Sequence, residues 1–141
     1  MKKLLLLLVI FSISFVSCKK DNIVCSRKTE NLALENATLI VSGNLSFLSK
    51  TNTGIAKIYL QKNGKYLLGL EKMNFTPGVS SFIYLSPSKT LSPEAMKIFS
   101  VNNLQGDVFH VLPSGIDISF FKYLIIQTEL AEEIVASADL N

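Results

Sequence analysis

Residues 123–127, with the sequence YLIIQ, place the strongest constraint on the fold of this 141-residue chain. The run has the length of a β-strand, and it is apolar at successive rather than at alternate positions. Both of its faces must therefore be buried against other parts of the protein. A strand at the edge of a sheet, exposed to water, suits such a run poorly. We therefore expect residues 123–127 to form a central strand of the core.

Further strand-length runs, separated by turn residues, occupy most of the chain. They are rich in aromatic and β-branched residues, and none continues the 3.6-residue period of a long helix. The strongest local signal is Asn63-Gly64 between two alternating runs, which is typical of a β-hairpin. The other expected strands are residues 37–47, with a bend or bulge at Gly43-Asn44, and residues 54–61, 65–70, 79–86, 96–101 and 108–112. Residues 91–94 are expected to start one helical turn. This spacing predicts an all-β fold, an antiparallel β-sandwich or jelly-roll-like domain.

The first strand of the hairpin predicts one core face and one solvent face, because its side chains alternate. The core face is expected to carry Ala56, Ile58 and Leu60, and the solvent face Lys57, Tyr59 and Gln61.

Charge is unevenly distributed along the chain. Five lysines of the hairpin region (Lys50, Lys57, Lys62, Lys65 and Lys72) oppose only Glu71, whereas six acids oppose Lys122 from residue 107 onward. A surface made of Lys57, Tyr59, Lys62 and Lys65 is therefore a candidate binding site for an envelope protein or an acidic glycan. The alternative is that these lysines are ordinary solubilising charges that protect an exposed hairpin.

The N-terminus has the three parts of an export signal. Lys2 and Lys3 precede an apolar run over residues 4–16, and a small residue, Ser17, then precedes Cys18. The apolar run is too short to span a membrane, which takes about 20 residues. Phe15-Val16-Ser17-Cys18 resembles the lipobox of bacterial lipoproteins, with phenylalanine in place of the usual leucine. The resemblance implies that residues 1–17 are removed as a signal peptide and that Cys18 becomes the first residue and is acylated, with palmitate among its acyl chains. The alternative is an ordinary signal peptide that ends near a cysteine.

Residues 18–35 are predicted to form a flexible tether, since they are polar and their apolar residues follow neither the period of a helix nor that of a strand. Residues 36–141 then form a single β-domain. A lipid-anchored chain of this kind belongs to the cell envelope, and Lys19 directly after the cysteine predicts the outer membrane. The Cys-Lys-Lys-Asp start is also similar to signals that send lipoproteins to the cell surface. Without Lys2 and Lys3 the formal charge falls from +3 to +1, so no overall basicity predicts a nucleic-acid partner.

No group of residues has the spacing of a catalytic or metal site. His110 is the only histidine. Alternation places it on one face with Val108 and Leu112, which favours a partly buried histidine over a ligand. Asp117 is expected to cap a turn.

The remaining candidates for chemistry are acids and one thiol. Glu129, Glu132 and Glu133 are expected to form a solvated face rather than an acid-base group. With Cys18 acylated, Cys25 is a lone thiol in the tether, and we interpret it as unpaired and without a role. The sequence therefore predicts a protein that is not an enzyme and that holds no metal or cofactor.

From residue 39 to residue 140 the chain resembles the DM-thirteen domain, a small all-β module that occurs beside DOMON domains in animal proteins and alone in many bacterial lipoproteins. The ordered series of matching pieces carries this resemblance, since no single piece is specific. The pieces are Ser42-Gly43, residues 53–59, Asn63-Gly64, Gly78, residues 83–86, Gly106 through Phe109 to Pro113, residues 116–118, Phe121, residues 123–126 and residues 138–140.

Two departures from the family pattern bear on function. Val79-Ser80 follows Gly78, where the family usually has Pro-Asp. Ile126-Gln127, or Gln127-Thr128 after a one-residue shift, replaces the aromatic-cysteine pair that is the ground for suggesting electron transfer in the family. Without that thiol, no thiolate at this position is available to ligate a metal or relay an electron. We therefore predict a non-catalytic binding or structural module, with an electron-transfer or redox accessory domain as the alternative.

Overall fold

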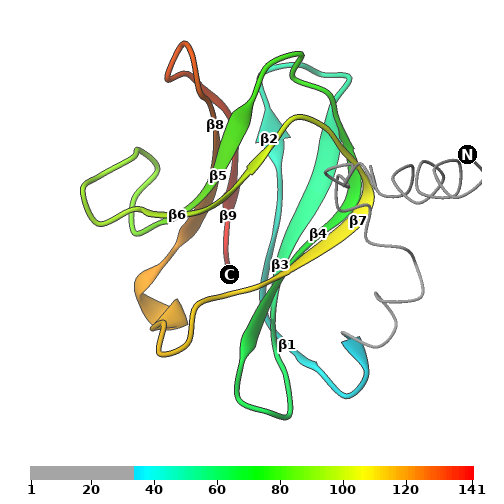
Figure 1. Cartoon of the computed structure of the whole chain (residues 1–141), viewed down its shortest axis with the longest axis vertical. Coiled ribbons are helices and arrows are strands. Elements are labelled where there is room, and N and C mark those ends of the chain that lie inside the picture. Colours follow the sequence, from blue (N-terminus) through cyan, green and yellow to red (C-terminus); the bar gives the residue numbers. More distant parts are fainter. Residues whose placement is uncertain (1–33) are drawn as a thin grey trace, which may run out of the picture.

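The computed structural model describes residues 34–141, which form two antiparallel β-sheets packed against one another (Figure 1). The four-stranded sheet has the order β1-β3-β4-β7 and the five-stranded sheet the order β2-β9-β8-β5-β6. The expected all-β, sandwich-like domain is therefore confirmed. Within the described residues, no helix is long and apolar enough to cross a membrane. The strands are β1 (Thr38–Asn44), β2 (Ser46–Phe47), β3 (Thr53–Leu60), β4 (Tyr66–Phe75), β5 (Ser81–Ser86), β6 (Met96–Val101), β7 (Leu104–Val111), β8 (Tyr123–Thr128) and β9 (Ile134–Asp139), and a 3₁₀ helix η1 (Ile118–Phe120) precedes β8.

The predicted signal peptide, Cys18, Cys25 and all but the last two residues of the predicted tether lie outside the described residues.

Strand β8 is the centre of the five-stranded sheet, as its sequence predicts. Leu124, Ile125 and Ile126 are all completely buried. Leu124 and Ile126 belong to the core between the sheets, whereas Ile125 lies outside that core, on the other face of the strand. Both faces of β8 are therefore covered, which explains why this run is apolar at successive positions.

The expected strand over residues 37–47, with its bend or bulge at Gly43-Asn44, is interrupted after Asn44 and divided between the two sheets. The chain leaves the four-stranded sheet after β1, and the two residues of β2 pair with β9 in the other sheet, with Ser46 opposite Ser137. Leu45 makes the crossing, with its side chain in the core and its N–H group donating to the Gly54 carbonyl at 3.0 Å. The apolar alternation continues through the crossing, so the sequence does not show where the chain changes sheet.

Strands β4 and β7 are longer than expected. The register of the β4–β7 pair shifts between Leu70 and Met73, and Lys72 has a φ of 51°, so β4 contains a bulge and continues to Phe75. This bulge interrupts the alternation that predicted the strand. The first half of β7, from Leu104, pairs with this extension.

The structure also has a strand that was not expected and a turn where a helical turn was expected. Strand β9 was not predicted, because its small residues Ala136 and Ala138 give a weak apolar pattern, yet both are 2% exposed. Residues 93–94 form a single hydrogen-bonded turn, closed by the N–H group of Ala95 and the Ser92 carbonyl at 2.9 Å, rather than a helical turn.

The two ends of the sandwich carry different loops. At one end, the lower end in Figure 1, the β3–β4 hairpin lies close to the loop that joins β7 to η1. We call this the hairpin end. The chain also enters β1 here, because Thr38 pairs with Leu60 at the base of the hairpin. The β2–β3, β4–β5 and β8–β9 connections lie at the opposite end (Figure 1).

Candidate functional site

The β3–β4 hairpin forms one wall of a cleft at the hairpin end. Its turn is closed by two backbone hydrogen bonds, from Gln61 to the Lys65 carbonyl and from Gly64 to the Gln61 carbonyl, both 2.9 Å long. The Asn63 side chain also accepts from the Lys65 N–H group at 2.9 Å. These bonds confirm the hairpin predicted from Asn63-Gly64 and fix the position of Lys65.

The loop after β7 forms the facing wall. The N–H group of Leu112 donates to the Tyr66 carbonyl at 2.9 Å and ties this loop to the start of β4. Gly115 has a φ of +79°, a conformation that favours glycine and turns the chain toward η1. A cleft of about 320 Å³ separates the two walls, and it is lined by residues 63–66 and 113–116.

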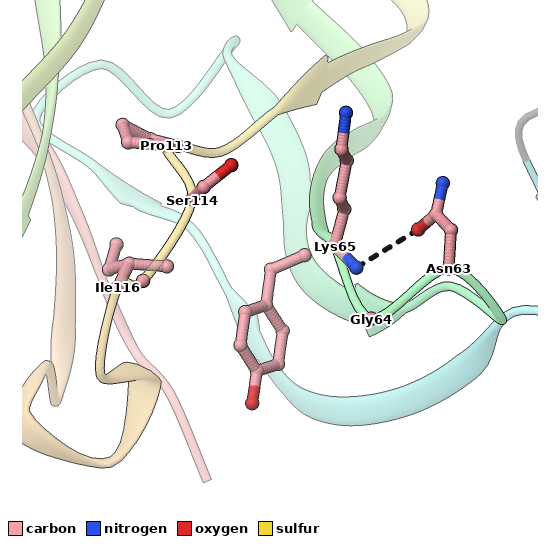
Figure 2. A pocket seen from close by; sticks show the side chains of 8 residues that line it. Asn63, Gly64, Lys65, Pro113, Ser114 and Ile116 are labelled. Carbon is pink, nitrogen blue, oxygen red and sulfur yellow. Dashed lines mark hydrogen bonds between the residues drawn. The ribbon is translucent and has the colours of Figure 1, made fainter.

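The cleft brings together a positive charge and several hydrogen-bond donors. Figure 2 shows the side chains of Lys65 and Ser114 on its opposite walls, with the Ser114 hydroxyl directed toward the hairpin. Among residues 34–141, the Ser114 hydroxyl and the N–H groups of Ser114 and Gly115 have no hydrogen-bond partner. Successive N–H groups beside a residue with positive φ form a concavity that suits an anion. The lining of the cleft therefore offers a positive charge and hydrogen-bond donors, the groups with which proteins hold carboxylates and phosphates.

The residues of the predicted binding surface, Lys57, Tyr59, Lys62 and Lys65, differ in their surroundings. Lys62 and Lys65 lie in and next to the hairpin turn, and Lys65 lines the cleft. Lys57 and Tyr59 lie on the outer face of the four-stranded sheet, where both contact Glu71 of β4. This face is not the open solvent face that the alternation predicted, because Leu67 on it is only 2% exposed.

Glu71 neutralises the charge of Lys57. The Lys57 Nζ lies 2.5 Å from the Glu71 Oε2, and the Tyr59 hydroxyl donates to the Glu71 Oε1. The hydrogen bond to Glu71 raises the pKa of Lys57, and burial, followed by the hydrogen bond to Glu71, raises the pKa of Tyr59. Both groups therefore keep their protons at neutral pH and join Glu71 in a cross-strand contact.

The basic region counted along the sequence is also divided in space. Lys50 lies in the β2–β3 loop, at the end opposite the hairpin, and Lys72 lies in the bulge of β4. Glu129, Glu132 and Glu133 are exposed in the β8–β9 connection, as expected. A single strand runs from one end of a sandwich to the other, so residues that are near one another in the sequence can lie at opposite ends. The number of lysines in this stretch of sequence therefore does not describe a basic surface.

His110 lies where the alternation placed it. Val108 and Leu112 share its face and pack in the core, and the His110 ring stacks on Phe99 of β6 with centroids 4.7 Å apart and planes at 23°. Burial lowers the pKa of His110. A partly buried histidine is thus confirmed.

Asp117 caps η1, as predicted for a turn. Its Oδ1 accepts from the Ser119 N–H group at 3.0 Å and from the Ser119 hydroxyl at 2.6 Å. Within residues 34–141, no three His, Cys, Asp or Glu side chains are grouped so that they could hold a metal ion.

A set of aromatic residues lies on the outer face of the five-stranded sheet, where the sequence predicts no site. Phe82 and Tyr84 alternate with core residues in β5, and Tyr123 begins β8. The alternation of side chains along residues 81–86 predicts that Phe82 and Tyr84 share one face of the strand. That Tyr123 lies on the same face follows only from the pairing of β5 with β8.

Comparisons with known proteins give no family for the chain. No protein-family model matches it, and neither the curated proteins nor the solved structures contain a match. The function is therefore argued from the sequence motifs and from the geometry of the domain.

Proposed function

We propose that this chain is a lipoprotein of the bacterial cell envelope, anchored to the outer membrane through acylated Cys18, whose β-sandwich is a non-catalytic binding module. The export signal and the lipobox-like end of residues 1–18 support the anchor. The ordered similarity to the DM-thirteen domain, which also occurs as a bacterial lipoprotein, agrees with this arrangement of anchor, tether and single β-domain.

The cleft at the hairpin end is the observation that carries the binding role. Lys65 supplies a positive charge, and Ser114 and Gly115 supply donors that no residue of the described chain uses. Charge-assisted hydrogen bonds to an anion are about twice as strong as those between neutral groups. The ligand therefore carries a carboxylate or a phosphate, and the cleft binds this group without changing it.

The anchor is tested by fractionating cells that produce the full chain. The wild-type protein is expected in the membrane fraction, with the mass of a chain that begins at Cys18 and carries acyl groups. Cys18→Ser is expected to release the protein from the membrane, and Cys25→Ser, the matched control, is expected to leave it there. A wild-type protein whose mass shows no acyl groups on Cys18 would show that the anchor is wrong.

The cleft is tested by titrating the purified protein with inorganic phosphate and with acetate, followed by the amide resonances of Ser114 and Gly115. Lys65→Ala is expected to weaken binding about tenfold, because it removes the only charge that lines the cleft. Lys50→Ala removes a lysine from the opposite end and serves as the control. Equal binding by both variants would place the anion elsewhere.

The alternative function, electron transfer, comes from the family resemblance, and Cys25 is its only local support. Both cysteines of the chain lie outside the described residues, and no contact within residues 34–141 favours a redox role. An absorption spectrum and a metal analysis of protein purified natively from membranes test it. A stoichiometric metal, haem or flavin would overturn the binding module in favour of electron transfer.

A further inference from the structure

The outer face of the five-stranded sheet has a small apolar centre of its own. Ile125 of β8 is completely buried although it lies outside the core between the sheets. In the strand register Tyr84 lies opposite Ile125 on one side and Ser137 lies opposite it on the other. Phe82 and Tyr123 are each two positions away along the same face. Side chains on this face therefore cover Ile125, and three of them are aromatic.

Two lysines lie over these rings. The Lys97 Nζ is 3.1 Å from the centroid of the Phe82 ring, and the Lys89 Nζ is 5.7 Å from the centroid of the Tyr123 ring. Lys97 is opposite Tyr84 in the register of β5 and β6. Both lysines remain exposed to solvent. The Lys89 Nζ also lies 3.6 Å from the Asp139 Oδ2, and both groups are exposed, so this ion pair is weak.

The face also presents hydroxyl groups without protein partners. Ser100 lies opposite Phe82, and Ser137 lies opposite Ile125. Within the described residues, neither serine hydroxyl nor the hydroxyls of Tyr84 and Tyr123 form a hydrogen bond. Aromatic surface, hydroxyl groups and positive charge are therefore mixed on one sheet face.

We propose that this face binds an acidic polysaccharide, a chain of sugars that carry carboxylate groups. A sugar ring presents C–H groups on its flat side, which pack on aromatic rings, and hydroxyl groups at its edge, which pair with serine and tyrosine hydroxyls. Lys97 covers the ring of Phe82, so Tyr84 and Tyr123 provide the stacking surfaces. Lys89 and Lys97 pair with the carboxylates.

Charge and composition favour a polysaccharide over a protein as the occupant. The binding hot spots of protein interfaces are mainly large side chains that become buried in a dry centre. The large apolar side chains that the described residues expose are Leu39, Ile40, Leu48, Val79, Val111, Phe120 and Leu130, and none of them belongs to the aromatic face. An acidic, hydroxyl-rich chain matches both the lysines and the serines. The inference rests on the proposed role as a binding module, but it uses a surface separate from the cleft.

The experiment titrates the full-length protein in detergent micelles with a linear tetramer of galacturonic acid, and measures the affinity by calorimetry at two salt concentrations. A neutral glucose tetramer is the control ligand. The acidic tetramer is expected to bind and the neutral one to bind about tenfold more weakly. Binding of both ligands with equal affinity, or of neither, would overturn the proposal.

Variants locate the site. Tyr84→Leu keeps an apolar cover over Ile125 and is expected to weaken binding about tenfold. Lys97→Gln leaves the tyrosines intact and is expected to lower both the affinity and its dependence on salt. Phe120→Ala and Lys50→Gln, which change an exposed aromatic residue and a lysine on other surfaces, are expected to bind like the wild type.

One outcome separates this inference from the proposed function. If Lys65→Ala abolishes binding of the tetramer while Tyr84→Leu and Lys97→Gln do not, the saccharide binds in the cleft. The aromatic face would then be rejected and the binding module retained. Binding of phosphate in the cleft by the Tyr84→Leu protein is the internal check that this variant is folded and active.

Discussion

Two buried serines at the ends of β5, on opposite faces of the sheet, show how a single hydroxyl group changes the stability of the domain. Both Ser81 and Ser86 are completely buried. The Ser86 hydroxyl donates to the Thr90 carbonyl at 3.0 Å and accepts from the Ser88 N–H group at 3.3 Å. The Ser81 hydroxyl has no partner among residues 34–141. Burial without a partner leaves the desolvation of the Ser81 hydroxyl uncompensated.

Ser81→Ala is expected to raise the free energy of unfolding by up to about 1 kcal/mol, because it removes an uncompensated polar group. Ser86→Ala, at the other end of the same strand, is expected to lower it by about 1–2 kcal/mol, since it breaks two hydrogen bonds. Urea denaturation of the two variants and the wild type measures both changes. A loss of stability in Ser81→Ala as large as that in Ser86→Ala would mean that a buried water satisfies Ser81.

The partly buried ring of His110 makes stability depend on pH. Burial lowers its pKa in the folded state, so the unfolded chain binds a proton at a higher pH than the folded chain does. The stability of the protein is therefore highest above the unfolded pKa of about 6.5, and it decreases as the pH falls from that value through the lower pKa of His110 in the folded state.

His110→Phe keeps a ring against Phe99 and removes the titration. We expect the variant to lose less stability than the wild type between pH 7.5 and about 5.5, in thermal melts at each pH. Carboxylates titrate equally in both proteins, so the comparison isolates His110. Parallel stability curves for the two proteins would contradict the effect of burial on its pKa.

At the scale of single elements, β9 is the strand that the sequence conceals. It lies between β2 and β8, and its alternating residues face the core and the outside of the sheet in turn. Ala136 and Ala138 face the core, and a Cβ atom at Gly43 of β1 would lie 3.3 Å from that of Ala138, so the backbones approach closely here, while Ser137 faces outward next to Ile125. Small side chains here are a packing requirement and not a sign of a loop.

Ala136→Asp is expected to prevent folding, because it places an unpaired carboxylate in the core at a cost comparable to the 5–15 kcal/mol stability of a typical domain. Ser137→Asp, one position along the strand, is expected to cost less than about 1 kcal/mol, since its side chain is on the outer face. Circular dichroism and the yield of soluble protein distinguish the two. If both variants fold equally well, the assignment of the two faces of β9 is wrong.

At the scale of the whole molecule, the first strand and the last residues of the described chain close the sandwich together. Ser42 of β1 and Asn141 exchange backbone hydrogen bonds of 3.1 and 3.2 Å. The approach requires glycine at position 43, because a Cβ atom there would lie 2.1 Å from the carbonyl oxygen of Asp139. The two sheets are therefore joined at this corner by backbone contacts as well as by the core.

Gly43→Ala is expected to lower the free energy of unfolding by about 2–4 kcal/mol, since backbone of β9 must move to accept the methyl group. Gly78→Ala is the matched control. Its φ of +73° is unfavourable for alanine, but a Cβ atom there meets nothing within 4 Å, so we expect a loss of about 1–2 kcal/mol. Denaturation midpoints of both variants test this order. A smaller loss in Gly43→Ala than in Gly78→Ala would show that the corner is not closely packed.

The sequence by itself determined what is local along the chain. The strand character of the domain, the Asn63-Gly64 hairpin, the central place of β8, the core face of His110 and the cap at Asp117 all follow from periods and turn residues within a few positions. Each depends on the chemistry of neighbours in the sequence.

The tertiary structure decided what depends on distant segments. It divided residues 38–47 between two sheets, added β9, and paired Lys57 and Tyr59 with Glu71 of the neighbouring strand. It also placed Ser114 across a cleft from Lys65 and gathered the aromatic face from β5 and β8. Alternation tells which residues share a face of one strand, but the partner of that face is set by pairing between strands far apart in the chain.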